Sequence, residues 1–147
     1  MDFGQAEALF PAIEKIMSEN RLKPADLDLI TVCTGPGSFT GVRSSLAAAR
    51  TLGLALPSTG LTGVSAFEAY IHDLAPDELA FYNAVIIETK REDFYFQCFD
   101  AGKNKTGEPE ALEYDAVIDR LRHKKVTLTG DGVERFLSRP SGLCLRV

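Results

Sequence analysis

A glycine-rich run, Thr34 to Arg43, is the feature of this sequence that most restricts its fold. It lies between a strand-like segment, 27–33, and a helix-like segment, 42–54. Glycines and a proline at such a junction allow tight or left-handed backbone conformations that side chains would forbid. The unpaired N–H groups of the new helix also face whatever lies above the turn. A turn of this kind either cradles an anion or packs against another segment of backbone.

The spacing of these glycines does not match the nucleotide-binding loops. A P-loop has four residues between its glycines and continues Gly-Lys-Ser/Thr, whereas five residues separate Gly35 from Gly41 here and Val42-Arg43 follows. A dinucleotide-binding G-x-G-x-x-G loop needs a glycine where this chain has Thr40. It also needs an acidic residue about 20 residues further on, and the segment 58–64 contains none. Nucleotide binding by this loop alone is therefore disfavoured.

Composition limits the class of protein. The 147 residues are 45% apolar and 25% charged, which is typical of one globular domain or two small lobes. No apolar run approaches the ~20 residues of a membrane-spanning helix, and the N-terminus lacks a signal-peptide pattern. Cys33, Cys98 and Cys144 form no CxxC pair, which predicts free thiols in a reducing cytoplasm. The net charge of -5 argues against a large nucleic-acid footprint of its own.

Apolar spacing predicts an amphipathic helix near the N-terminus, with one broad apolar stripe. The stripe consists of Ala6, Leu9, Phe10, Ile13, Ile16 and Met17. The helix after the glycine turn is rich in small residues, and its only charges, Arg43 and Arg50, share one face seven positions apart. A helix so poor in large side chains lets a neighbouring backbone approach closely. That neighbour is either the chain's own sheet or another polypeptide.

The other segments predict alternating strands and helices. The segment 58–64 is expected to complete a strand–helix–strand unit with the largely buried strand 27–33. Ser65 and Glu68 form a capping box that starts a helix to about Leu74. Later expected elements are strands at 84–87 and 94–99, a helix at 114–123 and a short strand at 126–128. Alternation places Phe94, Phe96 and Cys98 on one face of their strand, and Tyr95, Gln97 and Phe99 on the other.

The run Gly35-Pro36-Gly37-Ser38-Phe39-Thr40-Gly41-Val42-Arg43 closely resembles the signature of the TsaB (YeaZ) family of tRNA threonylcarbamoyladenosine biosynthesis. Four other stretches resemble family motifs in the same order. They are 5–13 (H-A-E-x-L-x-P-x-I), 63–69 (G-V-S-S-L-E-A), 88–95 (D-A-R-x-x-E-V-Y) and 130–134 (G-D-G-A-E). The likeness therefore covers nearly all of the chain, and its central motif is highly specific.

The resemblance implies an α/β fold of the actin/Hsp70/sugar-kinase-like (ribonuclease H-like) type. Family members open with three strands, the first carrying an Asp-Thr-Ser-like turn, and they end with a helix after the G-D-G-x-E segment. We therefore expect residues 1–76 to form a partial N-terminal lobe without those strands, with two docking helices and the strand–helix–strand unit. Residues 77–147 are expected to form part of a second α/β lobe. The strand 27–33 would then lack one sheet partner, which predicts aggregation or self-pairing.

The resemblance also implies a function. It is that of a cytoplasmic, non-catalytic scaffold that docks on TsaD, with the ATPase TsaE, for threonylcarbamoyladenosine (t6A) modification of position 37 in tRNA. It implies no cofactor or metal of its own, no membrane, contact with tRNA only through the complex, and a homodimer through the same helices. The residues expected to dock are Ala6, Leu9, Phe10, Ile13, Arg43, Leu46, Ala47 and Arg50. An apolar stripe can equally enter the chain's own core, so both readings stay open.

Two other functional hypotheses remain. One is a nucleotide- or metal-dependent hydrolase or peptidase, because relatives of this family carry a glycoprotease (M22) label. Against it, His72 and His123 lie far apart in sequence, whereas metal sites need clustered ligands. Ser38 also lies one place early for a G-x-S-x-G nucleophile turn, and Asp131 between two glycines is typical of a structural turn. The second hypothesis is a fragment without function of its own.

Overall fold

The computed structural model describes residues 5–139 and 145–146, and the side-chain environments of residues 7–139. Contacts divide the chain into two compact units, Met1–Ser65 and Ala66–Val147. The predicted mixed α/β fold is confirmed, since both units contain helices and strands. None of the described helices combines the length and the apolar character that crossing a bilayer requires.

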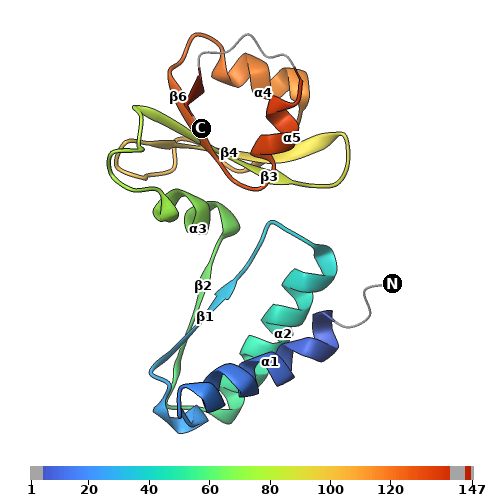
Figure 1. Cartoon of the computed structure of the whole chain (residues 1–147), viewed down its shortest axis with the longest axis vertical. Coiled ribbons are helices and arrows are strands. Elements are labelled where there is room, and N and C mark those ends of the chain that lie inside the picture. Colours follow the sequence, from blue (N-terminus) through green and yellow to red (C-terminus); the bar gives the residue numbers. More distant parts are fainter. Residues whose placement is uncertain (1–4, 140–144, 147) are drawn as a thin grey trace. The chain divides into compact units, whose positions relative to one another are not determined.

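The first unit is a strand–helix–strand motif with an added helix (Figure 1). Its elements are α1 (Gln5–Glu19), a 3₁₀ turn (Pro24–Asp26), β1 (Leu29–Cys33), α2 (Phe39–Ala55) and β2 (Gly60–Val64). The strands pair in parallel, with Leu29 opposite Gly60 and Cys33 opposite Val64. Helix α2 packs on β1 and β2, and α1 packs on α2. The predicted strand–helix–strand unit is therefore confirmed.

The expectation that β1 is a largely buried strand is wrong. Its residues alternate between exposed and half-buried, and Leu29 is 56% exposed. In the described part of the chain β1 pairs with β2 alone, in a two-stranded sheet. One face of that sheet meets α2, and no described helix or strand of the first unit packs on the other face. Burial on both faces needs two covering layers, and this unit supplies one.

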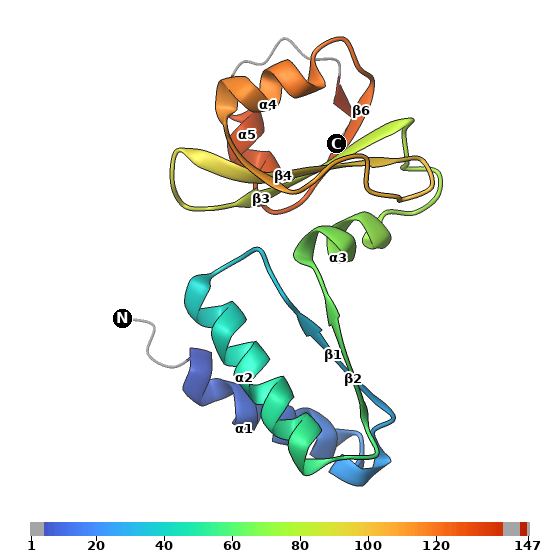
Figure 2. The ribbon, with the colours of Figure 1, turned by 180° about the vertical axis from the view of Figure 1, so that it is seen from behind.

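The second unit is built on a mixed sheet with helices on both faces (Figures 1 and 2). Its elements are α3 (Ala66–Asp73), β3 (Tyr82–Glu88), β4 (Asp93–Asp100), β5 (Glu110–Glu113), α4 (Tyr114–Leu121), β6 (Val126–Thr129), α5 (Val133–Leu137) and β7 (Leu145–Arg146). The described strands follow the order β5-β4-β3-β6-β7. Strands β3 and β4 form an antiparallel hairpin, and β3 pairs in parallel with β6.

Alternating side chains of β3 and β4 fill two cores, one on each face of the sheet. Ile86, Phe94 and Phe96 pack with α4 and α5, together with Val117 and Phe136. On the opposite face Val85, Ile87 and Phe99 pack with Phe67 and Ile71 of α3. The predicted division of β4 into two faces is therefore confirmed, because successive strand residues point in opposite directions.

The division between the two units falls between Ser65 and Ala66 in the sequence, earlier than the expected division between residues 76 and 77. The cause is the packing of α3. Ala66, Phe67 and Ile71 are all buried against the sheet of the second unit. Helix α3 therefore belongs to the second unit, although the sequence assigned it to the first.

Candidate partner-binding surface

The small residues of α2 serve two different faces. Ala48 and Ala49 are buried, and a Cβ atom on Gly53 would come within 3.2 Å of Leu61 Cδ2 in β2. Small side chains on this face therefore let the helix pack closely on its own sheet. For this face of α2, the hypothesis that the small residues pack against the chain's own sheet is therefore supported.

The opposite face of α2 is exposed. Arg43, Ala47, Arg50 and Leu54 follow one another at intervals of three or four residues, so they lie along one side of the helix. All four side chains are exposed, and Leu54 is 87% exposed. The guanidinium of Arg43 lies 4.9 Å from the ring centroid of Phe39, which extends the face to the first residue of the helix. This face carries apolar and cationic groups that the first unit does not bury.

The apolar stripe of α1 is only partly covered. Leu9 and Ile13 are half-buried, whereas Phe10 is 42% exposed and Ile16 is 60% exposed. Contacts between α1 and α2 account for the partial covering. A surface helix normally turns its apolar side chains to a core, so the exposed pair is a candidate contact for another polypeptide.

The structure thus separates the residues expected to dock. The exposed ones are Phe10, Arg43, Ala47 and Arg50, and the half-buried ones are Leu9, Ile13 and Leu46. The side chain of Ala6 lies outside the described residues. The exposed subset remains available to a partner, while the half-buried subset also supports the packing of the two helices on each other.

The glycine-rich turn connects β1 to α2 and is tied to the helix that follows it. Ser38 is the N-cap residue, and its Oγ accepts a hydrogen bond from the N–H of Gly41 at 3.4 Å. Gly35 has a φ of 92° and is buried, and a Cβ atom there would contact Val42. The turn therefore packs against the first turn of α2. Of the two roles that the sequence allowed, this geometry accounts for the packing role.

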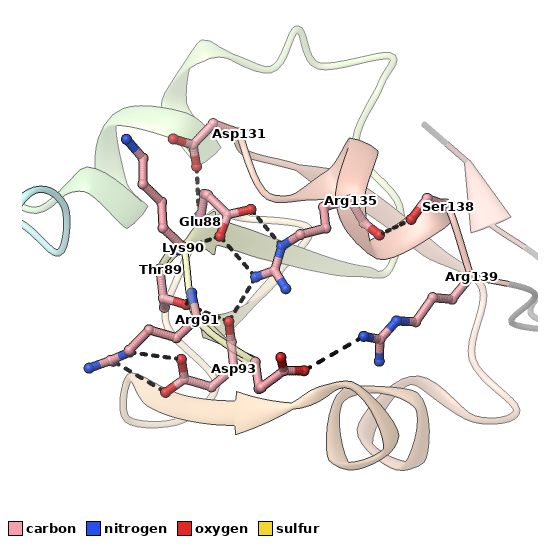
Figure 3. Close-up of polar contacts among 10 residues, drawn as sticks. Glu88, Thr89, Lys90, Arg91, Asp93, Asp131, Arg135, Ser138 and Arg139 are labelled. Carbon is pink, nitrogen blue, oxygen red and sulfur yellow. Dashed lines mark hydrogen bonds and ion pairs between the residues drawn. The ribbon is translucent and has the colours of Figure 1, made fainter. Parts of the chain in front are cut away.

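A second group of polar residues gathers at the end of β3 (Figure 3). Glu88 accepts two hydrogen bonds from Arg135 of α5, at 2.6 and 2.9 Å, and its backbone N–H donates to Asp131 Oδ1 at 2.9 Å. The N–H of Gly132 donates to the carbonyl of Ile86 at 3.0 Å. These bonds join the Gly-Asp-Gly segment to β3. The Asp131 carboxylate holds the backbone of β3 in place, which fits the turn role expected for Asp131.

The electrostatics of Glu88 follow from this arrangement. Loss of hydration raises the pKa of the Glu88 carboxyl, but hydrogen bonds from Arg135 and from the backbone of Lys90 and Thr89, together with the charge of Arg135, outweigh that effect and lower the pKa below its usual 4.5. The guanidinium also lies over the ring of Phe94, 3.8 Å from its centroid, and donates to the carbonyl of Asp93 at 2.8 Å. Arg135 therefore links α5 to both strands of the hairpin.

Sequence reasoning did not identify Arg135. One sequence feature could have pointed to it. Arg135 follows Gly130 by five residues, on the helix that begins directly after the Gly-Asp-Gly turn. His72 and His123, considered as metal ligands, lie in α3 and after α4, and both are exposed. Among the described residues, no three His, Cys, Asp or Glu side chains lie close enough to hold a metal ion together.

Comparison with known proteins places these features in context. The model of a protein family described as TsaD, tRNA N6-adenosine threonylcarbamoyltransferase, matches residues 5–123. A Mycobacterium tuberculosis (strain ATCC 25618 / H37Rv) protein described as uncharacterized is 31% identical over 104 residues, which are 71% of this chain and 46% of that protein. The tRNA threonylcarbamoyladenosine biosynthesis protein TsaB of Buchnera aphidicola is 43% identical over 51 residues, 33% of this chain and 23% of that protein.

Among solved structures, YeaZ from Pseudomonas aeruginosa is similar in fold, with a TM-score of 0.77 at 21% sequence identity. The superposition covers 95% of this chain and 67% of that one. The chain spans about half the length, or less, of the curated relatives that it matches. The matched family segment, residues 5–123, includes α1, α2 and the glycine-rich turn between β1 and α2.

Proposed function

Because this chain belongs to the TsaD family and is a TsaB/YeaZ-type member of it, we propose that it acts in t6A modification of tRNA position 37. In this role it docks on a TsaD-like protein, together with a TsaE-like ATPase, and it meets tRNA only within that complex. Its place of action is the cytoplasm. The TsaD-like partner carries out the transfer chemistry, and this chain holds that partner in a competent conformation.

The observation that carries this proposal is the exposed apolar and cationic surface of α1 and α2. Phe10 and Ile16 of α1 and Leu54 of α2 are all more than two-fifths exposed although both helices already pack within the first unit. Fully burying such a side chain contributes roughly 1.5–3 kcal/mol. A few anchors of this kind are enough for a stable complex when they fit a partner's pocket. Helix-on-helix packing is the contact that this surface suits.

The proposal gives this chain no bond-making step. Its support is that the Glu88 carboxylate is bonded to Arg135 and that Asp131 Oδ1 accepts the backbone N–H of Glu88, so both groups take part in holding the end of β3. Titration calorimetry with ATP, ADP and zinc ions tests the competing hydrolase hypothesis. Tight stoichiometric binding of any of the three by this chain alone would count against the scaffold role.

The docking surface is tested by co-purification with a TsaD-like protein from the same cell. Phe10→Asp and Arg50→Glu are expected to abolish or strongly reduce capture, since they place a carboxylate where apolar and cationic contacts are needed. Phe81→Asp is the matched control, because Phe81 is 74% exposed but belongs to the second unit. Circular dichroism checks that all variants are folded.

Full capture by Phe10→Asp and Arg50→Glu would refute docking through α1 and α2. If Phe81→Asp lost capture to the same extent, the loss would be a general effect of placing a carboxylate at an exposed apolar position and not a sign of docking through α1 and α2. The t6A content of tRNA, in cells that depend on this chain for the modification, is expected to follow the capture results. Modification that persists without capture would contradict the scaffold role.

A further inference from the structure

The second unit has a pocket of about 200 Å³ on the face of its sheet that α4 and α5 cover. Its floor consists of Tyr82 of β3 and Phe96 and Cys98 of β4. Phe96 is buried, and the other two side chains are half-buried. All lining residues belong to the second unit, and none of them lies in the Gly-Asp-Gly segment. The pocket is therefore distinct from both groups of residues described above, and its floor is largely apolar.

The loop after β4 forms a fixed wall of this pocket. Thr106, Gly107 and Glu108 line it. The N–H of Thr106 donates to the carbonyl of Cys98 at 3.0 Å, and Nε2 of the buried Gln97 donates to the carbonyl of Gly107 at 3.0 Å. Because these bonds hold the loop to the strand, a ligand does not have to order the wall before it binds.

Two cationic side chains complete the lining. Arg120 of α4 donates two hydrogen bonds to Glu110, at 2.7 and 2.8 Å, so these two charges largely cancel. Lys124, in the turn before β6, has its Nζ 4.9 Å from the centroid of the Tyr82 ring. None of the ion pairs of the described residues includes Lys124. An ammonium group carries three hydrogen-bond donors, so Lys124 can bind an anion at this pocket.

The charges around the floor have a net positive effect. Burial is the main influence on the pKa of the Cys98 thiol and raises it. Among the charges, Lys124 and then Arg120 lower this pKa, and each has a larger effect than Glu110, which raises it. Glu108 also lines the pocket but is not among the charges that act on the thiol. An apolar floor in a positive field suits an anion with an apolar body.

We propose that this pocket binds a small organic monocarboxylate, with its apolar part on the floor and its carboxylate at Lys124. The volume corresponds to about six or seven water molecules at roughly 30 Å³ each, which is too small for a nucleotide. A planar carboxylate of about nine non-hydrogen atoms, such as benzoate, is of the right size, and ligands this small bind with millimolar to micromolar affinity. The site does not depend on the proposed role in tRNA modification.

The thiol on the floor makes binding measurable. Benzoate at about 10 mM is expected to slow the modification of Cys98 by iodoacetamide at least about threefold, because it covers the thiol and adds a negative charge beside it. Cys33 is exposed in the first unit, so its unchanged rate is the internal control. Benzamide, a neutral molecule of the same shape, is expected to protect Cys98 less. Mass spectrometry of peptides measures both rates, with sodium chloride added to match the ionic strength.

Lys124→Gln tests the contact with the carboxylate. The rates with and without benzoate are compared within each variant, because removing this cation also changes the pKa of Cys98. Protection by benzoate is expected to disappear in Lys124→Gln. Lys125→Gln is the matched control, since Lys125 is exposed and adjacent in sequence but does not line the pocket. That variant is expected to keep full protection, and circular dichroism checks that both variants are folded.

Saturation-transfer NMR of benzoate with the full chain gives a second measure that does not involve the thiol. Saturation transfer that Lys124→Gln weakens, together with protection of Cys98, supports the site. Absence of protection in the wild type, equal protection by benzamide, or full protection in Lys124→Gln would each overturn the inference. Saturation transfer without protection of Cys98 would also overturn it, because benzoate would then bind elsewhere. None of these results bears on capture of the TsaD-like protein, which tests α1 and α2.

Discussion

Arg135 and Glu88 form a bidentate ion pair that fastens helix α5 to the end of strand β3 (Figure 3). Arg135 Nε donates to one carboxylate oxygen at 2.6 Å, and Nη2 donates to the other at 2.9 Å. The same guanidinium lies 3.8 Å from the centroid of the Phe94 ring. A planar group with donors in a fixed fork can make these contacts together, and an ammonium group cannot.

Arg135→Lys is therefore expected to lower the free energy of unfolding by about 1–3 kcal/mol, although it keeps the positive charge. Arg122→Lys is the control, because Arg122 pairs with Asp119 at 2.9 Å where both side chains are well exposed. That change is expected to cost less than about 0.5 kcal/mol. Urea denaturation measures both values. Equal stability of Arg135→Lys and the wild type would show that charge alone accounts for the contact.

Glu88 gives this ion pair a pH dependence. Its folded-state pKa is lower than the usual 4.5, because the hydrogen bonds and charge of Arg135, together with backbone hydrogen bonds from Lys90 and Thr89, outweigh the loss of hydration. The unfolded chain therefore binds a proton at Glu88 more readily, and the contribution to stability is fully present above pH 4.5. It is lost as the pH falls below that value towards the folded-state pKa.

Glu88→Gln is expected to be less stable than the wild type at pH 7, and this difference should shrink as the pH falls below 4.5. Comparing the two proteins is necessary because the pKa values of Asp93 and Asp100 are also lowered, in both cases mainly by hydrogen bonds. Protonation of Asp93 and Asp100 in acid is expected to lower the free energy of unfolding of both proteins to the same extent. A difference between wild type and variant that stays constant with pH would contradict the role assigned to Glu88.

Gly130 occupies a position that no other residue fits. Its φ is 112°, and a Cβ atom would lie 2.2 Å from the carbonyl oxygen of Ile86. Gly130→Ala is expected to lower the free energy of unfolding by at least about 2 kcal/mol, through backbone strain and displacement of β3. Gly107→Ala is the matched control, because nothing lies within 4 Å of its Cβ position. Thermal and urea unfolding compare the two, and a similar small effect at both sites would contradict the close approach.

Regular patterns in the sequence were enough to predict the elements that the fold depends on. The α1 stripe and the alternation in β4 each follow from one period of apolar residues, helix α2 was predicted from its place after the glycine turn and its small residues, and the structure has all three elements. Strand β5 and helix α5 were not predicted. Only two of the four residues of β5, Ala111 and Leu112, are apolar, and α5 has five residues, too short for a helical period to be visible. Such short elements are fixed by tertiary contacts.

The candidate surface was predicted less completely than the fold. Leu9 and Phe10 are neighbours on one apolar stripe, yet the first is half-buried and the second is exposed. The sequence gives the width of a stripe but not the direction from which α2 approaches it.

Cys98 and Cys33 are expected to differ in reactivity. Burial raises the pKa of the Cys98 thiol, an effect that the nearby charges of Lys124 and Arg120 only partly oppose. Cys33, at the end of β1, is exposed. Because the thiolate is the reactive form, iodoacetamide at neutral pH should modify Cys33 at least about tenfold faster than Cys98.

The measurement is mass spectrometry of peptides from protein alkylated for increasing times, in a Cys144→Ser background because Cys144 lies outside the described residues. In urea the two thiols should react at similar rates, since unfolding removes the burial that protects Cys98. Cys98 is half-buried at a pocket of about 200 Å³ that Tyr82 and Phe96 also line, so its protection depends on the folded second unit. Equal rates in the native protein would show that this pocket opens to solvent far more than its packing indicates.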